Sequence, residues 1–170
     1  MRIRIIGCSG SGKTYFAKRL SEKHNIPYFD LDDIQWDNSQ NSYGVKMPIE
    51  KRNQMLNDIL QQPDWIIEGV YYAWVQQSFE KADTIYVLDM PKWLYKFRII
   101  NRFFKRKIGL EKGKKETFKS ICDLLKWTDT FQNKNMKDII RILEQHNDKV
   151  IFIKNKREID RILTDSLCKR

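Results

Sequence analysis

The sequence predicts a three-layer α/β fold with a five-stranded parallel sheet at its centre. Short apolar segments alternate with segments of helical periodicity along the chain, as in sheets that carry helices on both faces. Residues 84–89 are apolar almost throughout, which is typical of a parallel strand buried on both sides. A glycine-rich stretch at 7–14 separates the first expected strand from the first expected helix. The length of 170 residues suits one domain, residues 1–170.

The first half of the chain is expected to contribute three strands and three helices. Phe16, Ala17 and Leu20 recur at helical spacing, and Pro48 is suited to the first turn of a helix. A polar stretch at 37–46 reads as an exposed loop. The expected strands are 2–6, 28–32 and 65–68, and the expected helices are 15–23, 48–60 and 72–81.

The second half continues the alternation. Pro91 opens a long helix that runs to about residue 106, and residues 108–115 contain two glycines and read as a loop. The strands expected here are 84–89 and 149–153, and the remaining helices are 116–131, 135–145 and 157–167.

The glycine-rich stretch carries the strongest functional signal. Residues 7–14 fit G-x-x-x-x-G-K-[ST], the phosphate-binding P-loop, and consist of Gly7, Cys8, Ser9, Gly10, Ser11, Gly12, Lys13 and Thr14. Backbone N–H groups of such a loop form an anion nest at the positive end of the following helix. Lys13 would contact the β- and γ-phosphates, and Thr14 would supply a hydroxyl for Mg²⁺. A chance match in a Gly/Ser loop is the alternative, but a strand before the motif and a helix after it favour binding of ATP or another nucleoside triphosphate.

Acidic residues follow three of the expected strands. Ligands of open parallel sheets bind beyond the carboxyl ends of the strands, and phosphoryl transfer uses carboxylates there to hold Mg²⁺ or orient the acceptor. Asp32 is therefore the candidate catalytic carboxylate on the acceptor side, and Glu68 the candidate for the Mg²⁺ shell, with Asp30 and Asp33 as further acceptor-side candidates. Asp89 precedes Met90-Pro91, so a structural role at the helix entry is expected for it.

Three arginines lie four residues apart on the long helix. Arg98, Arg102 and Arg106 share one helical face. A solvated basic stripe is the ordinary reading of such a pattern. This helix leaves a strand end of the same sheet, however, so the arginines could stabilise charge on a transferring phosphate. Arg98 and Arg102 are accordingly expected to be catalytic, and Arg106 to assist acceptor binding.

Bulk composition narrows the class of protein. The three cysteines have no metal-ligand spacing and the two histidines are far apart, so reduced thiols, a cytoplasmic location and no zinc site are expected. No signal peptide is expected, because the first residues lack an apolar core and a cleavage site, and no apolar run reaches membrane-spanning length. A net charge of +10 fits a phosphate-rich small substrate, a nucleic acid or simply a solvated surface.

Several segments together resemble the adenylate-kinase-like small P-loop kinases, and among these the DNA topology modulation (FlaR-type) proteins. The matching segments are residues 7–14, Asp32-Asp33-Ile34-Gln35-Trp36, Trp65-Ile66-Ile67-Glu68-Gly69, and Asp89-Met90-Pro91 with Arg98 and Arg102. The resemblance implies a P-loop NTPase fold with a helical lid at about 102–135 and an acceptor-binding region at about 30–62. It also implies that Arg98 and Arg102 grip phosphates and that Asn155 and Lys156 lie where a nucleobase would pack.

The sequence departs from the adenylate kinase pattern at the acceptor side. Val70-Tyr71-Tyr72 stands where adenylate kinases have Phe-Pro-Arg after an Asp-Gly pair, and Glu68 replaces the Asp of that pair. AMP is therefore not expected as the acceptor. Trp36 could stack on an acceptor ring and Arg52 could hold an acceptor phosphate, although a core and a surface position, respectively, would also explain them.

Two functions of different classes follow. The first is an ATP- and Mg²⁺-dependent phosphotransferase that acts on a hydroxyl or phosphate of a small-molecule acceptor held near Asp32. The alternative is a nucleic-acid-associated nucleotide-binding protein with little or no turnover, motivated by the +10 charge and the family label. A nucleotide-binding regulator without turnover is a third reading, against which the intact Lys13 and Thr14 argue.

Overall fold

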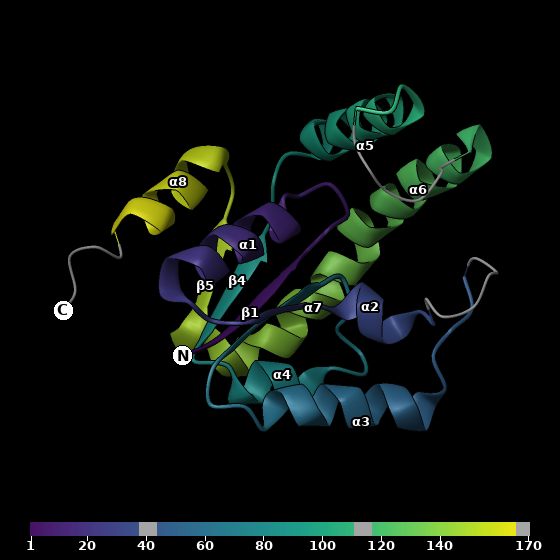
Figure 1. Cartoon of the computed structure of the whole chain (residues 1–170). Coiled ribbons are helices and arrows are strands. Elements are labelled where there is room, and N and C mark those ends of the chain that lie inside the picture. Colours follow the sequence, from purple (N-terminus) through teal and green to yellow (C-terminus); the bar gives the residue numbers. More distant parts are fainter. Residues whose placement is uncertain (38–43, 111–116, 166–170) are drawn as a thin grey trace.

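The computed structural model describes residues 1–37, 44–110 and 117–165. Its centre is a parallel sheet of five strands in the order β2-β3-β1-β4-β5, so the expected sheet is confirmed (Figure 1). The strands are β1 (Arg2–Gly7), β2 (Tyr28–Asp30), β3 (Trp65–Gly69), β4 (Thr84–Leu88) and β5 (Val150–Ile153). β1 occupies the middle of the sheet and pairs with β3 on one side and β4 on the other.

Helices cover both faces of this sheet. α1 (Lys13–His24) and α8 (Lys156–Asp165) lie on one face, while α3 (Ile49–Leu60), α4 (Gln76–Lys81) and α7 (Met136–Leu143) lie on the other (Figure 1). This division follows from right-handed crossovers: the chain moves one way across the sheet from β1 to β2 and the other way afterwards. The three-layer α/β prediction is therefore confirmed.

The remaining helices lie at the ends of the strands. α2 (Leu31–Gln35) follows β2 directly, and α5 (Lys92–Lys107) and α6 (Phe118–Thr130) lie beside each other at an outer corner of the molecule (Figure 1). A small apolar cluster of Ile99, Phe103 and Ile121 joins α5 to α6, apart from the main core around the sheet. Every residue of β3 is buried, as expected for a parallel strand covered on both sides.

Two expected element boundaries are wrong, for local reasons. The strand expected at 28–32 ends at Asp30, because the side chain of Asp30 accepts a hydrogen bond from the N–H of Asp32 and so caps α2. The helix expected at 72–81 is shorter and begins at Gln76.

The two helices expected at 116–131 and 135–145 form one continuous helical run from Phe118 to Leu143 in the described chain. Short 3-10 turns within Glu144–Lys149, interrupted by a kink at His146, lead from it to β5. A π-helical turn, Phe131–Asn135, joins α6 to α7. This stretch contains neither Gly nor Pro, and Phe131 and Met136 are both buried, so nothing interrupts the helix there. The loops expected at 37–46 and 108–115 lie largely outside the described residues. No helix of the described chain is long and apolar enough to span a bilayer.

Candidate active site

The P-loop turns sharply between β1 and α1. Gly10 and Gly12 have φ angles of 78° and 101°, in the left-handed region that glycine enters at little cost. A Cβ at Gly10 would also lie only 3.0 Å from the backbone oxygen of Tyr95 on α5. The loop is therefore built of glycine for two reasons, its backbone conformation and its close contact with α5.

Two cationic side chains hold the carbonyl groups of this loop. Nζ of Lys13 donates a hydrogen bond of 3.0 Å to the carbonyl of Cys8, and Lys13 is 7% exposed. Nη1 of Arg98, from α5, donates to the carbonyls of Gly10 and Ser11 at 3.2 and 2.7 Å. Partial burial lowers the pKa of Arg98 from its ordinary value. Because the carbonyls are bound by these cations, the N–H groups of the loop remain oriented for an anion.

The hydroxyl of Ser11 supports a ligand at this loop. Its Oγ is buried and has no hydrogen-bond partner within the described part of the chain. A buried hydroxyl without a partner loses the free energy of its bond to water. A phosphate oxygen in the loop would satisfy it, so the residues present fit a phosphate group.

Thr14 and Glu68 meet at the edge of the loop. Oγ1 of Thr14 donates a hydrogen bond of 2.5 Å to Oε1 of Glu68, which is 2% exposed. Glu68 lies on β3 opposite Ile5 of β1, so the strand pairing itself brings the carboxylate to the loop. Mg²⁺ binds through one or two carboxylates together with substrate phosphates, and these two oxygen groups fit that role. Among the described residues, no group of three or more His, Cys, Asp or Glu has the arrangement to hold a metal ion by protein ligands alone.

Asp30 extends this acidic site along the sheet. β2 pairs with β3 so that Asp30 lies opposite Glu68. Burial and the negative charge of Glu68 raise the pKa of Asp30 to about 7, since both disfavour its ionised form. A cation bound at this point would lower that pKa again, and perturbed carboxyl groups of this kind concentrate at functional sites.

Asp32 is held by a residue that the sequence reasoning did not single out. The hydroxyl of Tyr71 donates a hydrogen bond of 2.7 Å to Oδ1 of Asp32. Burial, together with this bond to a carboxylate, raises the pKa of Tyr71, whereas a hydrogen bond from Trp36 lowers it. Trp36, the expected stacking residue, therefore belongs to the same group as Asp32. The backbone N–H of Asp32 donates to Oδ1 of Asp30 at 2.9 Å, and Asp30 lies opposite Glu68 in the sheet.

A buried arginine anchors the segment that carries Tyr71. Arg4, in the middle of β1, is fully buried, and its guanidinium donates to the carbonyls of Ile67, Gly69 and Tyr71 at 3.3, 3.4 and 2.8 Å. Burial lowers its pKa to about 9, and the charge of Glu68 acts in the opposite direction. The signal for this role is a charged residue inside an apolar strand, which the sequence reasoning passed over.

Arg52 joins the acceptor side through an aromatic pair. Its guanidinium lies 4.3 Å from the ring centre of Trp74, and the Trp74 and Tyr71 rings are 5.6 Å apart. Cation–π stacking of this kind holds an arginine in place while its N–H groups stay available to other partners. Arg52 is therefore positioned beside the Asp32 and Tyr71 pair, and its Nε and Nη2 donate to Oδ1 of Asn53 at 3.3 and 3.2 Å.

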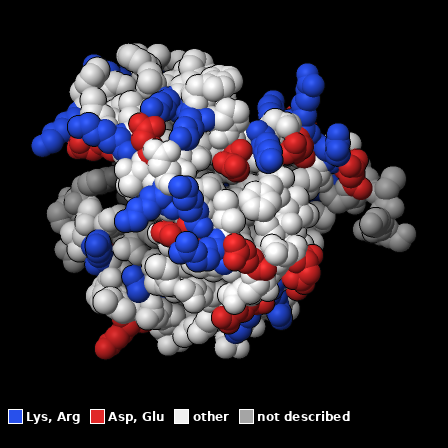
Figure 2. Space-filling view, turned by 180° about the vertical axis from the view of Figure 1, so that it is seen from behind, with Lys and Arg blue, Asp and Glu red and all other residues white. Residues whose placement is uncertain are grey.

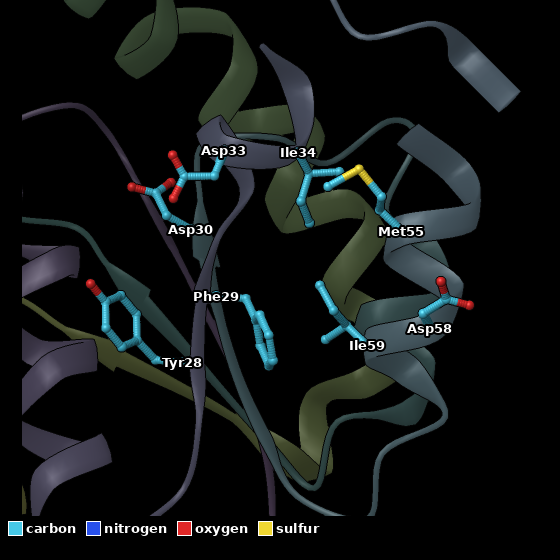
Figure 3. Close-up of a pocket in the computed structure, with 8 residues that line it drawn as sticks. All are labelled: Tyr28, Phe29, Asp30, Asp33, Ile34, Met55, Asp58 and Ile59. Atoms are coloured by element: carbon cyan, nitrogen blue, oxygen red, sulfur yellow. The ribbon is translucent and has the colours of Figure 1, made fainter. Parts of the chain in front are cut away.

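A pocket of about 460 Å³ opens beside these acids. It lies between β2, α2 and α3, with Asp30 and Asp33 at one end and Phe29, Ile34 and Ile59 along its walls (Figure 3). Met55 and Asp58 line it from α3 (Figure 3). The expected acceptor-binding region at 30–62 thus contains a cavity of ligand size.

The remaining residues expected in the site lie on α5 and α8 or just before these helices. Asn155 and Glu158 bond to each other, with Asn155 Oδ1 accepting from the N–H of Glu158 at 3.1 Å. The Asn155 side chain thus caps α8, and Lys156 is the first residue of that helix. Arg102 and Arg106 are partly exposed on α5, at the helical spacing from Arg98 that the sequence indicated. Asp89 does not cap α5, since no side-chain cap bond is formed at its N-terminus.

The glycine loop between a central parallel strand and a helix, with Glu68 bonded to Thr14, has the sequence and setting of a P-loop in a three-layer α/β fold. The chain is similar to adenylate kinases of Clostridium perfringens: that of strain SM101 and that of strain ATCC 13124 are each 28% identical to it over 193 residues, covering 94% of this chain and 89% of the relative. No protein-family model matches the chain.

Two solved structures are also similar to this chain. Shikimate kinase from Aquifex aeolicus is 18% identical with a TM-score of 0.47, covering 98% of this chain and 94% of that one. Shikimate kinase from Bacteroides thetaiotaomicron is 18% identical with a TM-score of 0.49, covering 96% and 94%. The resemblance to DNA topology modulation proteins stays a prediction.

Proposed function

We propose that this protein is an ATP- and Mg²⁺-dependent phosphotransferase that passes the γ-phosphoryl group to a hydroxyl or phosphate of a small acceptor. The observation that carries the proposal is the 2.5 Å hydrogen bond between Thr14 and Glu68. This bond joins the P-loop, which would bind the phosphates, to the buried carboxylate of Glu68 on the neighbouring strand, which would help to bind Mg²⁺. Similarity to adenylate kinases over 94% of the chain supports the reaction class.

The residues divide between the donor and the acceptor. The P-loop amides, Lys13 and Ser11 would bind the β- and γ-phosphates, and Thr14 with Glu68 would hold Mg²⁺, which neutralises charge on the transferring group. Arg102 lies four residues after Arg98 on the same face of α5 and would stabilise charge that develops in the transition state.

On the acceptor side, Asp32 would accept a hydrogen bond from the acceptor hydroxyl and take up its proton as the oxygen attacks phosphorus in line. Tyr71 would keep that carboxylate oriented. Arg52 and Trp36 would contact the body of the acceptor, which enters from the side of α2 and α3.

A turnover assay with an acceptor panel tests the proposal. The protein is incubated with ATP and Mg²⁺ and with nucleosides, nucleotides, small alcohols or hydroxy acids, and ADP release and the phosphorylated product are measured. Acceptor-dependent ADP release should appear with the wild type and be lost in Lys13→Ala. ATP binding without acceptor-dependent release across the panel would support the regulator reading instead.

The nucleic-acid alternative has a separate test. Lys and Arg side chains on the face shown in Figure 2 are interspersed with Asp and Glu rather than gathered in one continuous basic area. If the basic charge serves bound phosphates rather than nucleic acid, duplex DNA binding should be weak and should be lost by about 0.2 M salt, as for nonspecific charge contacts. Tight binding at that salt concentration would favour the alternative.

A further inference from the structure

The outward face of α5 carries a line of large apolar side chains. Trp93, Phe97, Ile100 and Phe104 are 68%, 60%, 39% and 53% exposed. Their spacing of four, three and four residues places them on one stripe of the helix. The buried residues of the same helix, Tyr95, Ile99 and Phe103, lie on a different face. We call the exposed line the α5 stripe.

A stripe of this kind needs an explanation. Single exposed apolar residues are ordinary, but contiguous ones mark interaction surfaces. The core does not require these four side chains, because α5 already packs on α6 and the P-loop through its other face. Ile108 and Leu110, just beyond the end of the helix, are 66% and 75% exposed and continue the apolar surface.

The charge around the stripe identifies the partner. The sixteen residues Lys92–Lys107 contain seven Lys or Arg and neither Asp nor Glu. Lys105 and Lys107 are exposed at the C-terminal end of the helix. Face-to-face pairing of two copies through this helix would bring like charges together, which costs free energy. The surface is complementary to one that is both apolar and anionic.

The shape of the surface selects among anionic partners. α5 lies at an outer corner of the molecule (Figure 1), and the pocket found in the described chain lies elsewhere, between β2, α2 and α3. A protruding ridge suits a bilayer interface, where no complementary groove is needed. Trp and Phe favour the headgroup region, and lysines beside them extend toward anionic lipid while their stems remain in apolar contact.

We propose that the α5 stripe docks this protein on membranes that contain anionic lipid. The stripe would enter the headgroup boundary and the lysines would contact lipid phosphates. Since Arg98 of the same helix holds the P-loop carbonyls, docking would place the phosphate loop close to the membrane surface. The proposal is independent of phosphotransfer.

Vesicle sedimentation tests it. Full-length protein is mixed with vesicles of phosphatidylglycerol and phosphatidylcholine, or of phosphatidylcholine alone, at low and at physiological salt. Wild type is expected to sediment with the anionic vesicles, and Trp93→Ser/Phe97→Ser to bind them at least tenfold more weakly. Lys105→Gln/Lys107→Gln should weaken binding on the order of tenfold, since each basic residue near an anionic surface contributes a severalfold effect.

A matched control uses exposed apolar residues on another element. Ile151 and Phe152 of β5 are 44% and 41% exposed, so Ile151→Ser/Phe152→Ser should leave vesicle binding unchanged. Circular dichroism and ATP binding confirm that each variant is folded. Equal loss in the β5 variant, equal binding to neutral vesicles, or no sedimentation with anionic vesicles would overturn the proposal. So would a dimer in analytical ultracentrifugation that depends on Phe97 without vesicle binding, or binding to polyglutamate alone.

Discussion

The hydroxyl of Tyr71 donates a 2.7 Å hydrogen bond to the carboxylate of Asp32, and so links the segment after β3 to α2. Behind Tyr71, the guanidinium of Arg4 holds the carbonyl of the same residue at 2.8 Å. A chain of contacts therefore runs from the centre of the sheet to the carboxylate proposed to orient the acceptor.

Tyr71→Phe should slow transfer without weakening ATP binding. The substitution keeps the ring packed on Trp74 but removes the bond to Asp32, and hydrogen bonds to charged groups contribute about 1.5–3 kcal/mol. A fall of about tenfold or more in kcat/KM for the acceptor is expected, with the Kd for ATP unchanged. Tyr72→Phe serves as the matched control because its neighbour Asp138 lies outside the site. An unaltered kcat/KM in Tyr71→Phe would show that Asp32 needs no such support.

Arg4→Met should destabilise the fold. It removes the donor to four carbonyl groups, those of Ile5, Ile67, Gly69 and Tyr71, and each buried group left without a partner costs about 1–3 kcal/mol. The melting temperature should fall by at least about 5 °C, given about 2–4 °C per kcal/mol for a chain of this size. Arg4→Lys should recover part of the loss, because one ammonium can still reach one or two of the carbonyls. Differential scanning calorimetry measures both variants, and a melting temperature equal to wild type in Arg4→Met would contradict this role.

Substitutions of Thr14 and Glu68 should raise the Mg²⁺ concentration that activity requires. Thr14→Ala and Glu68→Gln each remove a group expected to bind Mg²⁺ or its water, so the Mg²⁺ concentration for half-maximal activity should rise about 10- to 100-fold. Thr14→Ser keeps a hydroxyl and should stay close to wild type. Titration of Mg²⁺ at fixed ATP provides the measurement. A shift in ATP affinity alone, with the Mg²⁺ dependence unaltered, would place the metal elsewhere.

Asp30 should make stability depend on pH. Its pKa is raised from 3.8 to about 7 in the folded state, so between these values the folded protein binds more protons than the unfolded chain. The free energy of unfolding contributed by Asp30 is therefore retained below about pH 4, falls as the pH rises toward 7 and then levels off. Asp30→Asn, which keeps a capping oxygen for α2, should be more stable than wild type at pH 8 and should not differ at pH 4. Thermal unfolding without Mg²⁺ measures this difference, and equal melting temperatures at pH 8 would contradict it.

Substitutions of Arg98 and of Arg102 should have different effects on ATP affinity and on turnover. Arg98 holds the carbonyls of Gly10 and Ser11, so Arg98→Ala should weaken ATP binding together with turnover. Arg102→Ala should reduce turnover more than ATP affinity, because its contact is expected to strengthen as charge moves in the transition state. Isothermal titration calorimetry and steady-state kinetics distinguish these patterns. Equal losses of affinity and turnover in Arg102→Ala would rule out the role proposed for it.

Sequence reasoning located the local features of this protein. The P-loop could be read from residues 7–14 because its glycines, Lys13 and Thr14 act through the backbone of one continuous segment. The sheet could be predicted because strands buried on both faces show as apolar runs, and β3 and β4 lie within a residue or two of the expected positions. Strand pairing then explains why Asp30 and Glu68, read separately as strand-end acids, lie opposite each other.

Tertiary structure decided which of these residues work together. Tyr71 and Asp32 are 39 residues apart, and Arg4 and Tyr71 are 67 apart, so their contacts depend on strand order and on the path after β3, which no spacing in the sequence records. The periodicity of α5 likewise allows two apolar faces, and only packing on α6 selects the one that is buried. Local sequence determines backbone geometry over a few residues, whereas contacts between distant segments arise when apolar burial fixes the order of the sheet.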